Sequence, residues 1–146
     1  MSAEALILAA LGVPLLGALL IGMTGRINAN LREAVTLVTA VATFGFVSSL
    51  VPLVSAGEQP ALEVMSVLPG VVLAFDIEPL GMLFGLVASG LWILTSLYSV
   101  GYMRGHHEQN QTRFYICFAI AIAAALGVAF ARNLFTLFLF YEALTF

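Results

Sequence analysis

Long apolar stretches separated by short polar segments dominate the pattern of this chain. A membrane-spanning helix needs about 20 mostly apolar residues to cross roughly 30 Å of hydrocarbon. Three stretches of this kind cover residues 5–23, 34–54 and 80–102, and a shorter one without a charged side chain covers 114–131. The pattern therefore predicts an all-α integral membrane protein, folded as a multi-span helical bundle.

A fifth apolar stretch covers residues 134–146, where the sequence ends. As a helix it would rise only about 20 Å, which is too little to span the hydrocarbon. A helix that stops in hydrocarbon leaves its last carbonyl groups without partners unless protein covers them. We therefore expect residues 1–146 to form one membrane domain, the N-terminal portion of a larger subunit. The alternative is a small protein whose last half-helix is buried against a partner.

The charged residues predict how the helices are oriented. The segments 24–33 and 103–113 carry two arginines each, whereas the segment 55–78 has four acidic residues and no basic one. Because basic loops stay on the cytoplasmic side, we expect the N-terminus and the acidic segment on the outer side of a cell (inner) membrane. Arg132, in the outer turn before the last helix, runs against this rule.

The acidic segment also contains the signals of a β-hairpin. Residues 64–67 and 71–75 are β-prone, and they flank a Pro-Gly pair at Pro69-Gly70, which is a strong turn signal. We expect a short hairpin on the outer face. Ser2 is predicted to cap the first helix, and Pro79 to occupy the first turn of the third.

Composition agrees with this pattern and excludes several functions. Hydrophobic residues make up 62% of the chain and charged residues 9%, against roughly 25% charged residues in soluble domains. The single cysteine excludes a disulfide framework and a thiolate metal cluster. The net charge of -3 argues against a nucleic-acid partner. The chain has no nucleotide-binding glycine motif, and we expect no cofactor.

Glu142 is the most informative candidate for chemistry. It lies eight residues into the last helix, about 12 Å deep and close to the middle of the membrane. An ionisable group at this depth is costly, and such groups mark ion pathways, proton relays or structural ion pairs. We predict a transport or relay role for Glu142, with a structural pair or a misplaced helix boundary as the alternatives. Tyr141 is a candidate support, although packing against lipid or helices is the commoner role.

Two further groups of polar residues are candidates for ion access. Asp76 and Glu78 form an outer ion entrance or, alternatively, are helix-start charges that interact with the helix dipole. His106 and His107, with Glu108, are candidates for proton collection on the cytoplasmic side. Adjacent histidines point in different directions on a helix and one carboxylate is a poor third ligand. A solvated loop is therefore the favoured interpretation there, and no metal site is expected.

Several motifs in the second half of the chain recur together in one family. Residues 98–103 read Tyr-Ser-Val-Gly-Tyr-Met, and residues 133–135, Asn-Leu-Phe, precede Tyr-Glu-Ala-Leu-Thr at 141–145. Through these motifs the chain resembles the large antiporter-like subunits shared by respiratory complex I, membrane-bound hydrogenases and Mrp-type multisubunit cation/proton antiporters. Complex I subunits often have Trp where this chain has Tyr141. The Glu-Ala-Leu-Thr run is closer to the D-type member of the Mrp antiporters.

The resemblance implies a many-helix subunit built from inverted repeats, in which the glutamate of the fifth helix relays protons and pairs with a later lysine. Here that acid is Glu142.

The implied function is a proton-conducting subunit of a cation/proton antiporter, a transporter rather than an enzyme. The alternatives are the membrane arm of a complex I-like enzyme or hydrogenase, with redox chemistry in other subunits, or a structural module. The implied partners are other membrane subunits, lipid and H+, and Na+ or K+ as the coupled ion is left open.

Overall fold

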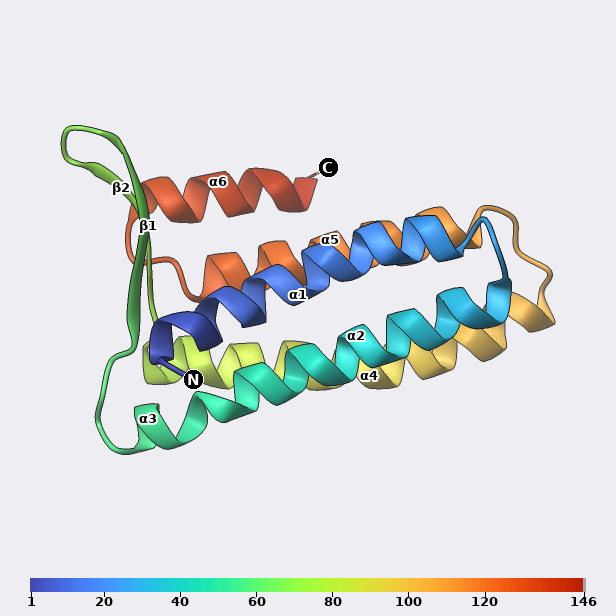
Figure 1. Cartoon of the computed structure of the whole chain (residues 1–146), viewed down its shortest axis with the longest axis horizontal. Helices are drawn as coiled ribbons and strands as arrows, with labels where there is room; N and C mark the ends of the chain where they lie inside the picture. The colour runs from blue at the N-terminus through green and yellow to red at the C-terminus, as the bar shows by residue number, and fades with distance from the viewer. Residues whose placement is uncertain (146) are drawn as a thin grey trace.

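Four helices in the computed structural model are long and apolar enough to cross a membrane, and they lie side by side as a bundle (Figure 1). The structure describes residues 1–145. The elements follow the order α1 (Ala3–Thr24), α2 (Ala29–Ser49), α3 (Val51–Ser55), β1 (Ala61–Leu68), β2 (Val71–Asp76), α4 (Pro79–Gly105), α5 (Gln111–Ala129) and α6 (Leu134–Thr145). The expected multi-span membrane bundle with a small hairpin is confirmed.

Local signals explain where the helices begin. The Ser2 hydroxyl accepts a hydrogen bond from the Ala5 amide at 3.3 Å, and Pro79 occupies the first turn of α4, both as predicted. Asn28 caps α2 in the same way, accepting a bond from the Asn30 amide at 2.9 Å. The second helix therefore begins at Ala29 rather than near residue 34.

The second apolar stretch, expected as one helix over 34–54, is divided near its end. α2 stops at Ser49, Leu50 forms the junction, and α3 starts at Val51 with Pro52 in its first turn. Proline has no amide hydrogen and cannot donate to the carbonyl group one turn earlier. The i→i−4 hydrogen-bond ladder is therefore interrupted at this place.

Small residues allow the helices to approach closely. α1 packs against both α2 and α5, α4 packs against α2 and α5, and α6 packs against α5. Gly17 of α1 faces Thr39 of α2 so closely that a Cβ atom at Gly17 would lie 2.2 Å from the Thr39 methyl group. Gly127 of α5 lies under the Phe140 ring of α6 in the same manner. Such contacts are typical of helix packing in membranes.

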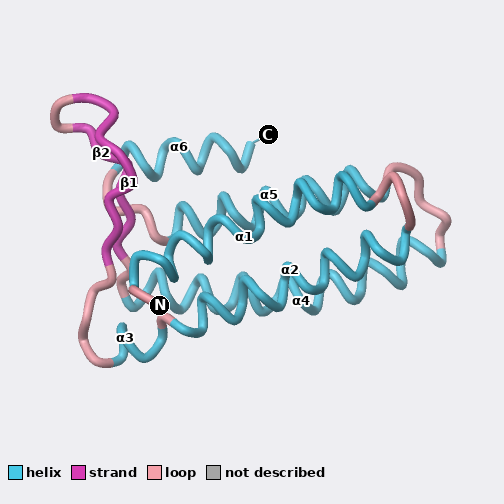
Figure 2. Tube along the Cα trace, in the orientation of Figure 1, coloured by secondary structure: helices cyan, strands magenta, loops and turns pink. Residues whose placement is uncertain are grey.

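The predicted hairpin is present at the end of the bundle where α1 begins (Figure 2). β1 and β2 pair antiparallel, with Leu68 opposite Val71 and Ala61 opposite Asp76. Gly70 has a φ of +86°, the conformation that the residue after Pro69 needs in a tight turn and that glycine adopts without a steric penalty.

Candidate functional site

Glu142 lies on α6, which starts beside the hairpin and runs alongside α5 (Figure 1). Phe140 faces α5, since its ring covers Gly127. Glu142 is two residues further on and so points about 200° around the helix from Phe140. It is exposed, and its carboxylate makes no hydrogen bond or ion pair with any residue that the structure describes. Tyr141 is also exposed, at 56%. The Glu142 side chain therefore points away from α5.

A polar junction fixes the start of α6 to the hairpin. The Asn133 side chain accepts a bond from the Thr136 amide at 2.8 Å, as a helix cap does, and donates to the Val72 carbonyl at 2.7 Å. The buried Thr136 hydroxyl accepts from the Ala74 amide at 3.1 Å. These contacts set the direction of α6 and, through it, the position of Glu142.

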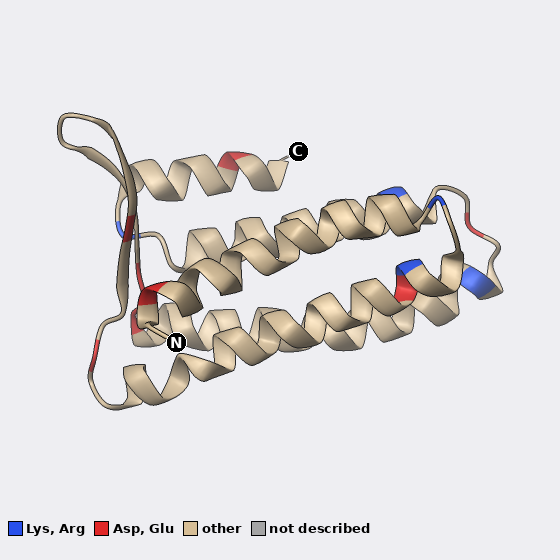
Figure 3. Ribbon diagram, viewed as in Figure 1, with Lys and Arg blue, Asp and Glu red and all other residues tan. Residues whose placement is uncertain are grey.

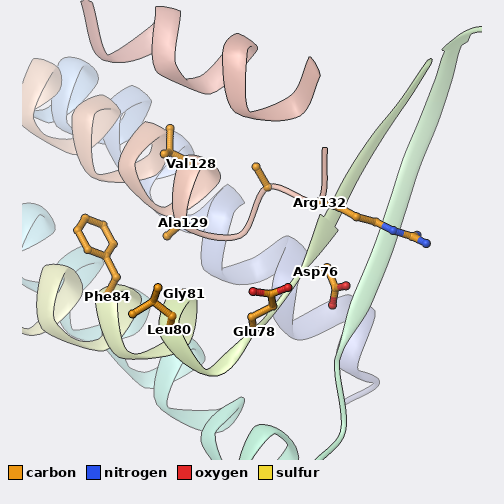
Figure 4. Close-up of a pocket in the computed structure, with 9 residues that line it drawn as sticks. Asp76, Glu78, Leu80, Gly81, Phe84, Val128, Ala129 and Arg132 are labelled. Atoms are coloured by element: carbon orange, nitrogen blue, oxygen red, sulfur yellow. The ribbon is translucent and has the colours of Figure 1, made fainter. Parts of the chain in front are cut away.

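Asp76 and Glu78 line one cavity of about 360 Å³ at the hairpin end of the bundle (Figure 4). The start of α4, with Gly81 and Phe84, and the segment after α5 form its other walls. One carboxylate oxygen of Asp76, Oδ1, is buried without a hydrogen-bond partner in the described part of the chain. The structure thus brings together the two acidic residues that were predicted as an outer entrance.

Arg132 also lines this cavity, but its guanidinium group extends toward the hairpin (Figure 4). There Nη1 lies 2.9 Å from Glu63 Oε1, in an ion pair whose two side chains are both largely exposed. The ion pair with Glu63 gives Arg132 a local partner at the hairpin end of the bundle, whereas the other four arginines lie toward the opposite end.

His106 and His107 lie at the opposite end of α4 and are both exposed. The His106 ring stacks on Tyr102 with centroids 4.2 Å apart, while His107 has a left-handed backbone with a φ of +51°. Within residues 1–145, no group of three His, Cys, Asp or Glu side chains is close enough to hold a metal ion. The structure therefore does not gather the two histidines and Glu108 into a cluster.

An ionic cluster, formed by the buried Arg32 and Glu33 and the half-exposed Arg104, was missed by the sequence analysis. Arg104 Nε donates to Glu33 Oε1 at 3.0 Å, and a second nitrogen of Arg104 bonds to Glu33 Oε2. Arg32 Nη2 lies 3.6 Å from Glu33 Oε1. Arg32 was expected in a loop; it is instead buried in the first turns of α2, because the Asn28 cap starts the helix early. Figure 3 shows basic and acidic positions near one another at the end of the bundle away from the hairpin.

The same cluster extends to α5. Arg32 donates to Thr112 Oγ1 at 3.1 Å and to Gln111 Oε1 at 2.7 Å. Its guanidinium carbon lies 5.4 Å from the centre of the Tyr115 ring, within the range of a cation–π contact. Three helices, α2, α4 and α5, are thereby joined. The signal in the sequence was Glu33, an acid directly beside Arg32 at the edge of an apolar stretch.

Comparisons with known proteins give matches of three kinds. The family described as "NADH-Ubiquinone oxidoreductase (complex I), chain 5 N-terminus" matches residues 70–115. The Na(+)/H(+) antiporter subunits A1 of Staphylococcus aureus strains JH9 and Newman are each 28% identical to this chain over 137 residues, which is 92% of this chain and 17% of theirs. In the structure of the membrane-bound sulfane sulfur reductase, an archaeal respiratory membrane complex, one chain matches with a TM-score of 0.78 and 22% identity, covering 94% of this chain and 21% of that one.

These matches support different conclusions about the fold and the family of this chain. The structural match, at 22% identity, shows a shared fold. The chain spans only 17% of the length of the curated relatives, which are A-type subunits, and the finer resemblance to the D type stays a prediction. Together the three findings confirm that this chain is similar to the antiporter-like membrane subunits of the superfamily that includes complex I and the Mrp-type cation/proton antiporters.

Proposed function

We propose that this chain is part of a proton-conducting membrane subunit of a multisubunit cation/proton antiporter, and that Glu142 relays protons within it. The observation that carries the proposal is the position of Glu142, deep along α6, pointing away from α5 and without a polar partner among the described residues. A carboxylate in that position is costly in hydrocarbon. Water or further protein that covers it would give it a partner with which to exchange a proton.

We further propose that residues 1–146 form the N-terminal portion of a longer subunit, and that a later helix covers the Glu142 face of α6. The greater length of the curated relatives supports this, as does a family description that names an N-terminus. A lysine on that helix would favour the ionised form of Glu142 when near, since an opposite charge stabilises a carboxylate. When the lysine moves away, Glu142 takes up a proton. Tyr141 is proposed as a hydrogen-bonding support.

The cavity lined by Asp76 and Glu78 is proposed as the outer ion entrance, and His106 and His107 as the proton-collecting groups at the other end. Carboxylate oxygens are the ligands that hard cations prefer. Asp76 lines the cavity, and its Oδ1 has no hydrogen-bond partner within the described chain. The proposal leaves Na+ and K+ as equal candidates for the coupled ion.

Cation/proton exchange in membrane vesicles that contain the complete complex tests the relay. A pH-sensitive dye reports proton movement when Na+ or K+ is added. Glu142→Gln is expected to abolish exchange while the complex still assembles, and Glu142→Asp to retain part of it. Glu63→Gln, in the exposed hairpin, serves as the matched control. Normal exchange by Glu142→Gln would overturn the relay.

A complex I-like or hydrogenase membrane arm is the second candidate. It is favoured by the family description, which names complex I, and by the shared fold with a respiratory membrane complex. Subunits that co-purify in mild detergent discriminate between the two. Iron–sulfur or flavin proteins favour the redox complex, whereas small membrane subunits alone favour the antiporter. A purely structural module would instead tolerate Glu142→Leu without loss of transport.

A further inference from the structure

An open groove of about 1180 Å³ runs along the outside of the bundle between α1 and α5. Its walls are apolar and include Leu15 and Leu19 of α1 and Ile116 and Ile120 of α5. At Gly22 the two helices approach closely, because a Cβ atom there would lie 3.3 Å from the Ile116 side chain.

Two arginines line one end of this groove. Arg26 follows α1 and Arg113 lies in the first turn of α5, and the two helices run in opposite directions, so both arginines reach the same end. Both are exposed, and neither makes an ion pair or a side-chain hydrogen bond within residues 1–145. The remaining three arginines are all paired with carboxylates. The groove is thus apolar along its length and carries two unbalanced positive charges at its mouth.

The length of the groove matches one leaflet of a membrane. From Leu15 to Thr24, α1 rises about 14 Å, and half of a hydrocarbon core is about 15 Å thick. The arginines then lie where the polar headgroups begin. Figure 3 shows basic residues gathered at this end of the bundle.

We propose that this groove binds an anionic phospholipid, with its phosphate between Arg26 and Arg113 and one acyl chain lying along the leucine and isoleucine side chains. Guanidinium groups bind phosphate oxygens through paired hydrogen bonds. Basic pockets between transmembrane helices are known to bind anionic headgroups. A zwitterionic lipid would leave the two charges only partly neutralised. A helix of another subunit would have to bring its own carboxylate to this end.

Native mass spectrometry of the full chain in neutral detergent tests the proposal. The chain is offered phosphatidylglycerol and phosphatidylcholine with identical acyl chains. The wild-type chain is expected to retain one phosphatidylglycerol in preference, and the Arg26→Gln/Arg113→Gln double variant to lose that preference by roughly tenfold or more. Both residues are exposed, so the variant is expected to fold. Arg132→Gln, at the other end of the bundle, is the matched control and should bind as the wild type does.

Two results would overturn the proposal: equal retention of both lipids by the wild-type chain, or an unchanged preference in the double variant. A second measurement identifies the occupant in intact membranes. A photoreactive benzophenone side chain in place of Leu19, which is 67% exposed, is expected to form a lipid adduct. A cross-link to another protein chain would show that protein fills the groove and would contradict the assignment to lipid.

Discussion

Glu33 and Arg104 lie 71 positions apart in the sequence, yet Arg104 donates hydrogen bonds to both carboxylate oxygens of Glu33. Arg32 lies 3.6 Å from the same carboxylate, so one buried acid balances two guanidinium groups. The cluster joins α2 to α4 directly and to α5 through Arg32. At this end of the bundle the helices are therefore held together by charge as well as by apolar packing.

Glu33→Gln is expected to destabilise the chain, because two guanidinium groups would then face each other without a carboxylate. Removing one partner of a fully buried pair costs about 3–5 kcal/mol. We expect roughly 2 kcal/mol, since solvent reaches about half of the partner side chain. Thermal unfolding in detergent measures the loss. Glu4→Gln, an exposed acid in α1, is the control and should leave the unfolding temperature unchanged. Equal unfolding temperatures for the two variants would contradict a stabilising role.

Gly127→Ala is expected to weaken the contact between α5 and α6. The new Cβ atom would lie 2.2 to 2.6 Å from three carbon atoms of the Phe140 ring, so the ring or the whole of α6 must move. Overpacking of this kind costs roughly 1–3 kcal/mol. The unfolding temperature should fall, and cation/proton exchange should fall with it if Glu142 is displaced. Gly12→Ala in α1 meets no atom within 4 Å and is the matched control.

Asn133→Ala is expected to loosen the junction between the hairpin and α6. The variant loses both the helix cap and the bond to the Val72 carbonyl, at a cost of about 1–2 kcal/mol. Hydrogen exchange should speed up for amides of β2 and of the first turn of α6, and stay unchanged in α1. Ser66→Ala, which removes a long and exposed bond within the hairpin, should leave these rates unaltered. Unchanged exchange in Asn133→Ala would show that packing alone fixes α6.

The orientation in the membrane can be tested by labelling. With Cys117 replaced by Ala, single cysteines at Ser66 in the hairpin and at Gln109 beyond α4 report the two ends of the bundle. The distribution of arginines predicts that a membrane-impermeant maleimide labels position 66 from outside intact cells, and position 109 only after lysis. Labelling in the reverse order would place the N-terminus in the cytoplasm.

Much of the fold follows from local signals in the sequence. The lengths of the apolar stretches predicted the spanning helices, and Pro69-Gly70 predicted the turn of the hairpin. Ser2 and Pro79 correctly marked the starts of two helices. The beginning of α2 was missed because Arg32 and Glu33 are charged and were assigned to a loop. Their burial depends on partners 71 to 80 positions away, which no local pattern reveals.

The candidate site was predictable only in part, for a similar reason. Counting along the last apolar stretch gives the depth of Glu142, but the direction in which it points is set by Phe140 packing on Gly127 of another helix. Asp76 and Glu78 were both candidates from their sequence position. Their shared cavity arises from the segment after α5, where Phe130 accepts a bond from the Asp76 amide at 2.8 Å.

Infrared difference spectroscopy tests the central claim, proton uptake and release by Glu142, most directly. The complete complex in lipid is exposed to a step in pH, and the carbonyl band of a protonated carboxylic acid is followed. The proposed relay predicts a change in this band in the wild-type complex that is missing in Glu142→Gln and present in Glu63→Gln. The same band change in Glu142→Gln as in the wild type would contradict the assignment of the relay to this residue.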